Sequence, residues 1–325
     1  MTASTQSSWI GFLVWRIGKS IPVLFAAAFL VFVLVDLVPG DPSITRLGQP
    51  TDAAERTKWL EENGFNDPIP VRYVRFLGDA LRGDFGHTLV SRQDIGTVVR
   101  EVTPVTLQLT GCAIAVALVV AAFIGALAAL KYDSWLGRLF QNVATLLMST
   151  PNYWLSIVAV GVFAVTLRWF PTGGYVSLSE GGVYAWFRCM VIPSTMLALP
   201  IAGALARIIR TAILEELDKD YMRFARAQGL SPARIVFSHL LRNVAIAPVT
   251  VLGLYAGYLL AGAAFIETAL SMPGIGRLVV DAALKADIWT LRAVAVLVAA
   301  IFLLITVLVD VAVFLLDPRS RVGSH

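Results

Sequence analysis

Long apolar stretches, separated by shorter polar ones, dominate the chain. Six stretches hold enough apolar residues to cross the roughly 30 Å hydrocarbon core of a bilayer as helices. Inside lipid a helix satisfies all of its own backbone polar groups, so each stretch is expected to be a membrane helix. Prolines at positions 151 and 200 interrupt the third and the fourth. The predicted spans cover about 21–38, 105–130, 140–166, 190–209, 245–266 and 291–315.

The longest polar stretch, residues 39–104, predicts a small helical domain outside the membrane, between the first and second spans. In "TDAAERTKWLEENG", Asp52 is a helix N-cap, Glu55 is the third helical residue and Gly64 follows the end. "PVRYVRFLGDALRG" predicts a second helix that Gly83 stops. The apolar face predicted for this second helix carries Val74, Leu77 and Leu81.

Two later connections also carry turn signals. Residues 167–189 contain "FPTGGY", a cluster typical of a turn. Residues 267–290 are too polar to span a membrane and break at Pro273–Gly274. This second connection predicts a hairpin that folds back toward the membrane.

Composition supports the membrane assignment. Of the 325 residues, 57% are hydrophobic and 15% are charged, whereas soluble domains average about 25% charged residues. A single water-soluble core cannot hide so much apolar surface. The net charge of +4 is therefore interpreted as the basic excess that membrane proteins keep on the cytoplasmic side, and not as a nucleic-acid interface. We therefore expect membrane lipid to surround the predicted spans.

The short connections predict the orientation. Basic residues occur before the first span, between the second and third, between the fourth and fifth, and after the sixth. With six spans these connections fall on one side, which the positive-inside rule makes cytoplasmic, with both termini on that side. The basic residues are Arg16, Lys19, Lys131, Arg138, Arg207, Arg210, Lys219, Arg223, Arg226, Arg234, Arg242, Arg319 and Arg321.

Candidate chemistry in the chain is sparse. Cys112 and Cys189 lie at the edges of apolar runs and are interpreted as small core residues, not as a disulfide, and no Cys/His spacing typical of a metal site occurs. "GKS" at 18–20 resembles the tail of a P-loop, but Leu13 stands where the earlier glycine is required. We therefore expect no ATP site, no metal and no other cofactor in this chain.

Two acids in predicted spans have two interpretations. Asp36 lies near the outer end of the first span, and Asp310 lies about two turns inside the last. Acids within membranes often mark a proton relay or an active site. The opposite depths exclude a shared carboxylate pair, and ion pairs or helix-end contacts near the interface are favoured.

The stretch from Leu214 to Leu241 predicts two short helices on the cytoplasmic side. Leu214, Leu217, Tyr221 and Phe224 form an apolar stripe on the first helix, supported by a Glu215–Lys219 pair. Gly229 is placed to stop this helix, with Leu230 folding back over it. Ser231 and Pro232 then begin the second helix. An amphipathic segment lying on anionic lipid is the alternative, but the tight corner favours a contact with another protein.

This stretch resembles the cytoplasmic coupling motif of binding-protein-dependent ABC transporter permeases, in its dipeptide and oligopeptide version. The matching residues of "DYMRFARAQGLSPARIVFSHLLRN" are Asp220-Tyr221, Ala225-Arg226-Ala227, Gly229-Leu230, His239 and Arg242-Asn243. "PGDP", "GDFG", "FPTGGY", "SMPGIGRLVVDA" and "LDPRSRV" follow the same family's order, from about residue 10 to 322. One departure is Pro248, one place later than the family pattern.

The resemblance implies an all-α polytopic membrane protein with the type I ABC importer permease fold. It divides the chain into a cytoplasmic N-terminus with the first span (1–38), an extracytoplasmic domain (39–104), a permease core of five spans with coupling helices at about 214–241 (105–316) and a cytoplasmic tail (317–325). The implied location is the inner membrane of a bacterium.

The resemblance also implies partners and a mechanism. The partners are a second, related permease subunit, two ABC ATPase subunits that bind ATP and Mg, and an extracytoplasmic peptide-binding protein. Closure of the ATPase dimer moves the coupling helix, and the spans rock between inward- and outward-facing states. The implied ATPase-coupling residues are Asp220, Tyr221, Arg223, Phe224, Ala225, Arg226, Ala227, Gly229 and Leu230.

Other functions are open on the sequence alone. The same permease subfamily serves nickel and some glycosides, so a nickel or other small-solute permease is the nearest alternative to a peptide permease. An intramembrane enzyme is a different class, but neither HExxH nor GxSxG occurs. A secondary transporter usually carries an internal repeat, which the sequence does not suggest. The residues that line the path are not predicted.

Overall fold

The computed structural model describes residues 3–37, 42–47, 52–228 and 240–316. Within these ranges every regular element is a helix. The elements are α1 (Ala3–Asp36), α2 (Pro42–Leu47), α3 (Ala53–Glu62), α4 (Ile69–Leu81), α5 (Ile95–Leu130), α6 (Trp135–Ser149), α7 (Asn152–Ala159), the π-helical η1 (Val160–Thr166), α8 (Leu178–Leu217), α9 (Asp220–Ala227), α11 (Leu241–Ala269), α12 (Ile275–Leu284) and α13 (Ile288–Leu316).

Five described helices are long and apolar enough to cross a membrane: α1 from Gly18, α5, α8, α11 from Asn243, and α13. They correspond to the first, second, fourth, fifth and sixth predicted spans. The third predicted span is bent, because α6 and the helix over Asn152–Thr166 meet at 101°. The bend falls at Pro151, which has no backbone N–H to continue the α6 hydrogen-bond ladder.

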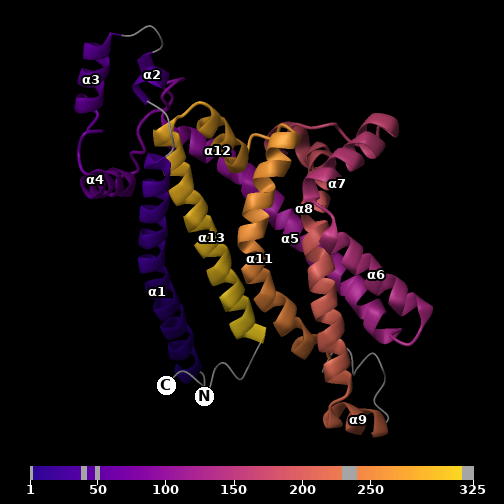
Figure 1. The fold of residues 1–325 in the computed structure, drawn as a ribbon. Helices are drawn as coiled ribbons and strands as arrows, with labels where there is room; N and C mark the ends of the chain where they lie inside the picture. The colour runs from indigo at the N-terminus through magenta and orange to yellow at the C-terminus, as the bar shows by residue number, and fades with distance from the viewer. Residues whose placement is uncertain (1–2, 38–41, 48–51, 229–239, 317–325) are drawn as a thin grey trace.

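The helices group their connections at two ends of the molecule (Figure 1). The start of α1, the connection between α5 and α6, the short helix α9 and the end of α13 lie at one end. Helices α2, α3, α4, α7 and α12 lie toward the other. The arrangement fits the prediction that the basic connections share one side.

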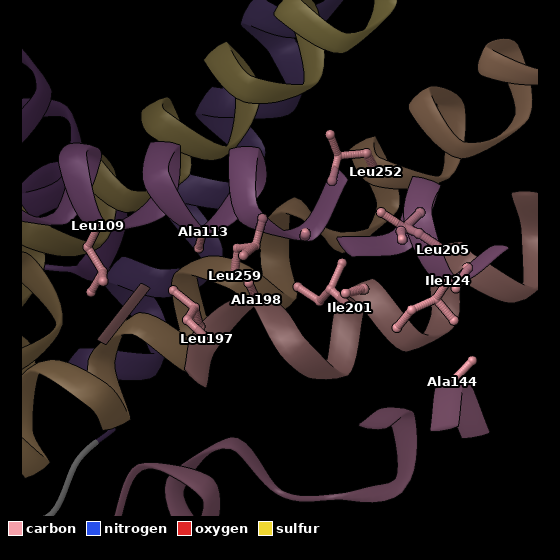
Figure 2. Packing of buried hydrophobic residues seen from close by; sticks show 14 of the residues in the cluster. Leu109, Ala113, Ile124, Ala144, Leu197, Ala198, Ile201, Leu205, Leu252 and Leu259 are labelled. Carbon is pink, nitrogen blue, oxygen red and sulfur yellow. The ribbon is translucent and has the colours of Figure 1, made fainter. Parts of the chain in front are cut away.

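The centre of the core lies between α5 and α8, where one face of α5 is built from small side chains. Ala113, Ala117 and Ala121 of α5 recur every fourth residue and are fully buried, so they form one narrow face. A methyl group at the next position, Gly125, would lie 2.7 Å from the backbone oxygen of Ala206 on α8. Small residues of this kind let membrane helices approach closely. Figure 2 shows residues of α5, α8 and α11 meeting in this core.

The helices α3 and α4, predicted to belong to an extracytoplasmic domain, follow the predicted caps but only part of the predicted face. Asp52 caps α3, and Gly64 and Gly83 adopt positive φ angles of 68° and 83° after their helices. The face predicted for α4 is wrong at Val74 and Leu81, which are 68% and 80% exposed. Leu77, the third predicted member, does pack against the cluster formed with α1. The face that packs on α1 is rotated by about one residue and carries Ile69, Tyr73 and Phe76.

Both predicted turns are present. Gly174 adopts φ +85° and its N–H donates to the backbone oxygen of Leu270 at 2.7 Å. The "FPTGGY" turn is thereby joined to the end of α11. After Pro273–Gly274 the chain folds back as α12, and a methyl group at Gly276 would lie 2.2 Å from Cα of Ala264. Helix α12 therefore packs tightly against α11, which makes the predicted hairpin.

Candidate coupling site at the end of α8

The motif predicted to couple to an ATPase begins with a short helix, α9, beyond the end of α8 (Figure 1). Helix α8 stops at Leu217, two residues intervene and α9 begins at Asp220. The predicted stripe over Leu214, Leu217, Tyr221 and Phe224 is therefore not on one helix, and this prediction is wrong in that respect. The chain turns at Asp218–Lys219, so the last two members of the stripe belong to a separate element.

A buried carboxylate fastens α9 to two longer helices. Glu216, in the last turn of α8, is 5% exposed. It accepts hydrogen bonds from the Lys219 ammonium group, the Tyr221 hydroxyl and the Asn243 side-chain amide, the last at 2.7 Å. Asn243 also donates to the Tyr221 hydroxyl at 3.0 Å. This network joins α8, α9 and α11, and hydrogen bonds to a charged group are stronger than neutral ones.

The Tyr221 hydroxyl keeps its proton in this network. Partial burial, followed by the hydrogen bond to the Glu216 carboxylate, raises the pKa of Tyr221 above its ordinary value. The phenol therefore stays neutral at physiological pH and can donate to Glu216.

The side chains of α9 face two directions. Met222 is fully buried and belongs to the main core, whereas Phe224 is 63% exposed. Residues two apart on a helix point to different faces, so the anchored face and the free face of α9 are separate. A large exposed aromatic ring on a firmly held helix is a suitable contact for another protein.

The predicted Glu215–Lys219 pair is wrong. Lys219 pairs with Glu216 instead, three residues away. The break after Leu217 turns Lys219 toward the buried side of α8, where Glu216 lies.

The described residues include part of the predicted coupling set. Asp220 begins α9, Tyr221 and Phe224 have the contacts given above, and Ala227 ends the helix with an exposed side chain. The backbone of Arg223, Ala225 and Arg226 is helical within α9. Gly229, Leu230 and the second helix predicted from Ser231 lie outside the described residues, except that α11 begins at Leu241.

The two membrane acids form ion pairs, as favoured from the sequence. Asp310 lies 2.5 Å from a guanidinium nitrogen of Arg16, near the end that carries α9. Asp36, at the opposite end of the molecule, pairs with Arg72 of α4 and Arg292 of α13. Sequence reasoning missed Arg292, which is 7% exposed. The available signal was that Arg292 is a single arginine near the start of a largely apolar helix.

A second buried acid was also missed. Glu267, in the last turn of α11, is fully buried. Its Oε1 accepts from the Thr106 hydroxyl at 2.6 Å, and its Oε2 accepts from the N–H groups of Gly276 and Arg277 at 2.8 and 3.1 Å. The Thr106 hydroxyl accepts from the N–H of Ile275 at 2.8 Å. These bonds satisfy the free N–H groups at the start of α12, so Glu267 fixes α12 to α5 and α11.

The structure also places the two cysteines and the "GKS" residues. Cys112 and Cys189 are both free thiols, and Cys189 is buried in the core. The "GKS" residues at 18–20 lie within α1. A phosphate-binding loop needs successive free backbone N–H groups, which a helix interior does not offer.

Membrane-spanning helices around an alanine-rich core, with a short anchored helix at one end, define a polytopic α-helical membrane protein. The family model of the binding-protein-dependent transport system inner membrane component matches residues 121–322. The chain belongs to this family and is a membrane component of such a transport system.

Named relatives extend the match to nearly the whole chain. A putative peptide transport system permease protein of Brucella abortus (strain 2308) is 35% identical, over 94% of this chain and 97% of its own. The di/tripeptide transport system permease protein of Pseudomonas aeruginosa (strain UCBPP-PA14) is 32% identical, over 96% and 99%. The oligopeptide transport system permease protein of Bacillus subtilis (strain 168) is 31% identical, over 95% and 98%.

Proposed function

We propose that this chain is the channel-forming subunit of an ATP-driven importer of short peptides. Family membership supports the transport role, and the names of the three relatives above support peptides over nickel or another small solute. Among the described residues, no group of three or more His, Cys, Asp or Glu side chains is arranged to hold a metal.

Helix α9 is the proposed contact with the ATPase. The observation that carries this proposal is that one face of α9 is anchored and the other is exposed. Glu216 and Met222 hold the anchored face, and Phe224 lies on the exposed face. A helix held in this way transmits a push on Phe224 to α8 and α11 without yielding locally. Closure of two ATPase subunits on ATP and Mg would then change the angle between the spans, and this chain itself would bind no nucleotide.

The proposed orientation places the α9 end in the cytoplasm, together with both termini. The basic residues of the connections at that end favour it. The extracytoplasmic domain of α2, α3 and α4 would then face a peptide-binding protein. A second permease subunit would complete the path, as the family resemblance implies.

Uptake of a labelled tripeptide into reconstituted vesicles tests the proposal. The vesicles contain the permease pair and two ATPase subunits. The binding protein is added on the side of the membrane that carries α2, α3 and α4. We expect Phe224→Ala to lower ATP-driven uptake by roughly tenfold or more, as truncation of an interface hot spot does. Trp135→Ala is the matched control, since Trp135 is 66% exposed near the same end, and should keep uptake. Equal uptake by both variants would contradict the proposed role of α9 in coupling. Preferential uptake of nickel would contradict the proposal that short peptides are the substrate.

A further inference from the structure

A cavity of about 460 Å³ opens between α6, α8 and α11, alongside the last four turns of α8. Its volume lies within the range of small-molecule sites, about 300–1,000 Å³. Its walls combine apolar side chains, one aromatic ring and three polar side chains of α8. The lining residues are Met148, Ala204, Arg207, Ile208, Thr211, Ala212, Glu215, Ala247 and Tyr255.

The three polar residues form one line along α8. Arg207, Thr211 and Glu215 are four residues apart, which places them above one another on a single helix face. All three are exposed, whereas Ile209 and Ile213 between them are buried. A helix face covered by lipid is apolar. An exposed polar line in the inner half of a span therefore indicates contact with water or with a polar solute.

Two charges in this line have no partner among the described residues. In the described part of the chain, neither Arg207 nor Glu215 makes an ion pair or a side-chain hydrogen bond. Asp36 and Asp310, by contrast, each pair with an arginine, Arg292 and Arg16 respectively. Uncompensated charge near the membrane is costly, so opposite charges on a ligand would be attracted to both residues.

We propose that this cavity is the inner section of the peptide path, and that Arg207 and Glu215 hold the carboxylate and ammonium ends of a short peptide. The proposal rests on the function proposed above. Eight residues of helix separate the two charges by about 12 Å along the axis. Three extended peptide residues span roughly 10–11 Å, so a tripeptide-sized zwitterion can reach both. Tyr255 and Met148 offer apolar surface to its side chains.

Cysteine labelling of the complete transporter tests this site. Thr211→Cys is placed between the two charges, in a chain with Cys112→Ser and Cys189→Ser. The complex is reconstituted without nucleotide, and the rates of reaction with an anionic and a cationic thiosulfonate reagent are measured. Val119→Cys is the control, because Val119 is 70% exposed on the apolar span α5 and should not react with either charged reagent.

Three results are expected. Thr211→Cys reacts with both reagents, and millimolar trialanine slows the reaction, whereas trialanine with acetylated and amidated ends does not. Arg207→Gln lowers the rate with the anionic reagent by roughly tenfold, as loss of a focused charge does. Glu215→Gln has the corresponding effect on the cationic reagent.

Other outcomes overturn the inference in recognisable ways. An unreactive Thr211→Cys would mean that the line of polar residues is buried against the second permease subunit. Reaction without protection by trialanine would mean that the cavity contains water but does not bind peptide ends. Uptake by the cysteine-containing parent is measured in the same vesicles. If this parent imports trialanine while protection is absent, only the site assignment fails; if it imports none, the proposed function fails first.

Discussion

The Asp36 carboxylate at the end of α1 lies 2.5 Å from a guanidinium nitrogen of Arg292 on α13. The same carboxylate accepts a 2.8 Å hydrogen bond from Arg72 of α4, which lies between the first and second spans. The Arg292 guanidinium also lies over the ring of Phe32, 4.1 Å from its centre. One buried carboxylate thus joins the first span, the last span and the domain between the first and second spans.

Asp36→Asn should destabilise the protein strongly. The change leaves two arginines, 7% and 12% exposed, without a countercharge, and removing one partner of a buried ion pair costs about 3–5 kcal/mol. Thermal unfolding of the purified protein measures the effect. Asp67→Asn is the control, because the pair between Asp67 and Arg75 is exposed and such pairs contribute roughly 0–1 kcal/mol. Equal melting of both variants would contradict the joint role of Asp36.

Gly203→Ala should be destabilising, although alanine favours helices. A methyl group there would lie 2.4 Å from the backbone oxygen of Ala144 on α6, and overpacking costs typically about 1–3 kcal/mol. Gly111→Ala on α5 meets nothing within 4 Å and should stabilise by roughly 0.5–1 kcal/mol. The two midpoints of thermal unfolding should therefore shift in opposite directions. A higher midpoint for Gly203→Ala would show that α6 does not pack so closely on α8.

Tyr221→Phe should loosen α9 without unfolding the spans. The change removes the hydroxyl that donates to Glu216 and accepts from Asn243, and one such bond contributes about 1 kcal/mol. Hydrogen exchange of the α9 amides should accelerate by roughly fivefold, the factor that corresponds to this free energy. Tyr258→Phe is the control, because Tyr258 is 74% exposed. Unchanged exchange in α9 would mean that Met222 alone holds the helix.

Glu267→Gln should release the start of α12. The carboxylate oxygens accept from the Thr106 hydroxyl on one side and from the N–H groups of Gly276 and Arg277 on the other. The amide has only one acceptor oxygen, so at least one of these buried donors is left unsatisfied, at a cost of about 1–3 kcal/mol. Exchange of the α12 amides and the unfolding midpoint both report the change. Thr106→Ser keeps the hydroxyl that Glu267 accepts and should remain close to the parent. If the glutamine variant is as stable as the parent, the carboxylate is not what holds α12.

Local signals were sufficient for much of the fold. Apolar length located the spans, because lipid requires long helices. The caps at Asp52, Gly64 and Gly83 act within one turn of the chain, so the local sequence was enough to predict them. The break between Leu217 and Asp220 could not be predicted from the sequence, because no Gly or Pro marks it and the apolar spacing continues across it.

The missed parts of the site depend on contacts between distant residues. Glu267 meets Thr106 across 161 positions, and Arg292 meets Asp36 across 256. Neither partner can be chosen from a sequence pattern, because many acids and bases lie at similar depths. The face of α4 was misjudged for a related reason: Val74 and Leu81 are apolar, but Tyr73 is the residue whose hydroxyl reaches the backbone of Phe25, at 2.7 Å.

Photo-cross-linking from position 224 tests the central claim most directly. A photoreactive phenylalanine analogue replaces Phe224, which is 63% exposed on the free face of α9, in the assembled complex within membranes. We predict an adduct with an ATPase subunit, whose yield changes when ATP is bound. Adducts with lipid or with the external binding protein, and none with an ATPase subunit, would contradict the proposal that α9 transmits ATPase closure to the spans.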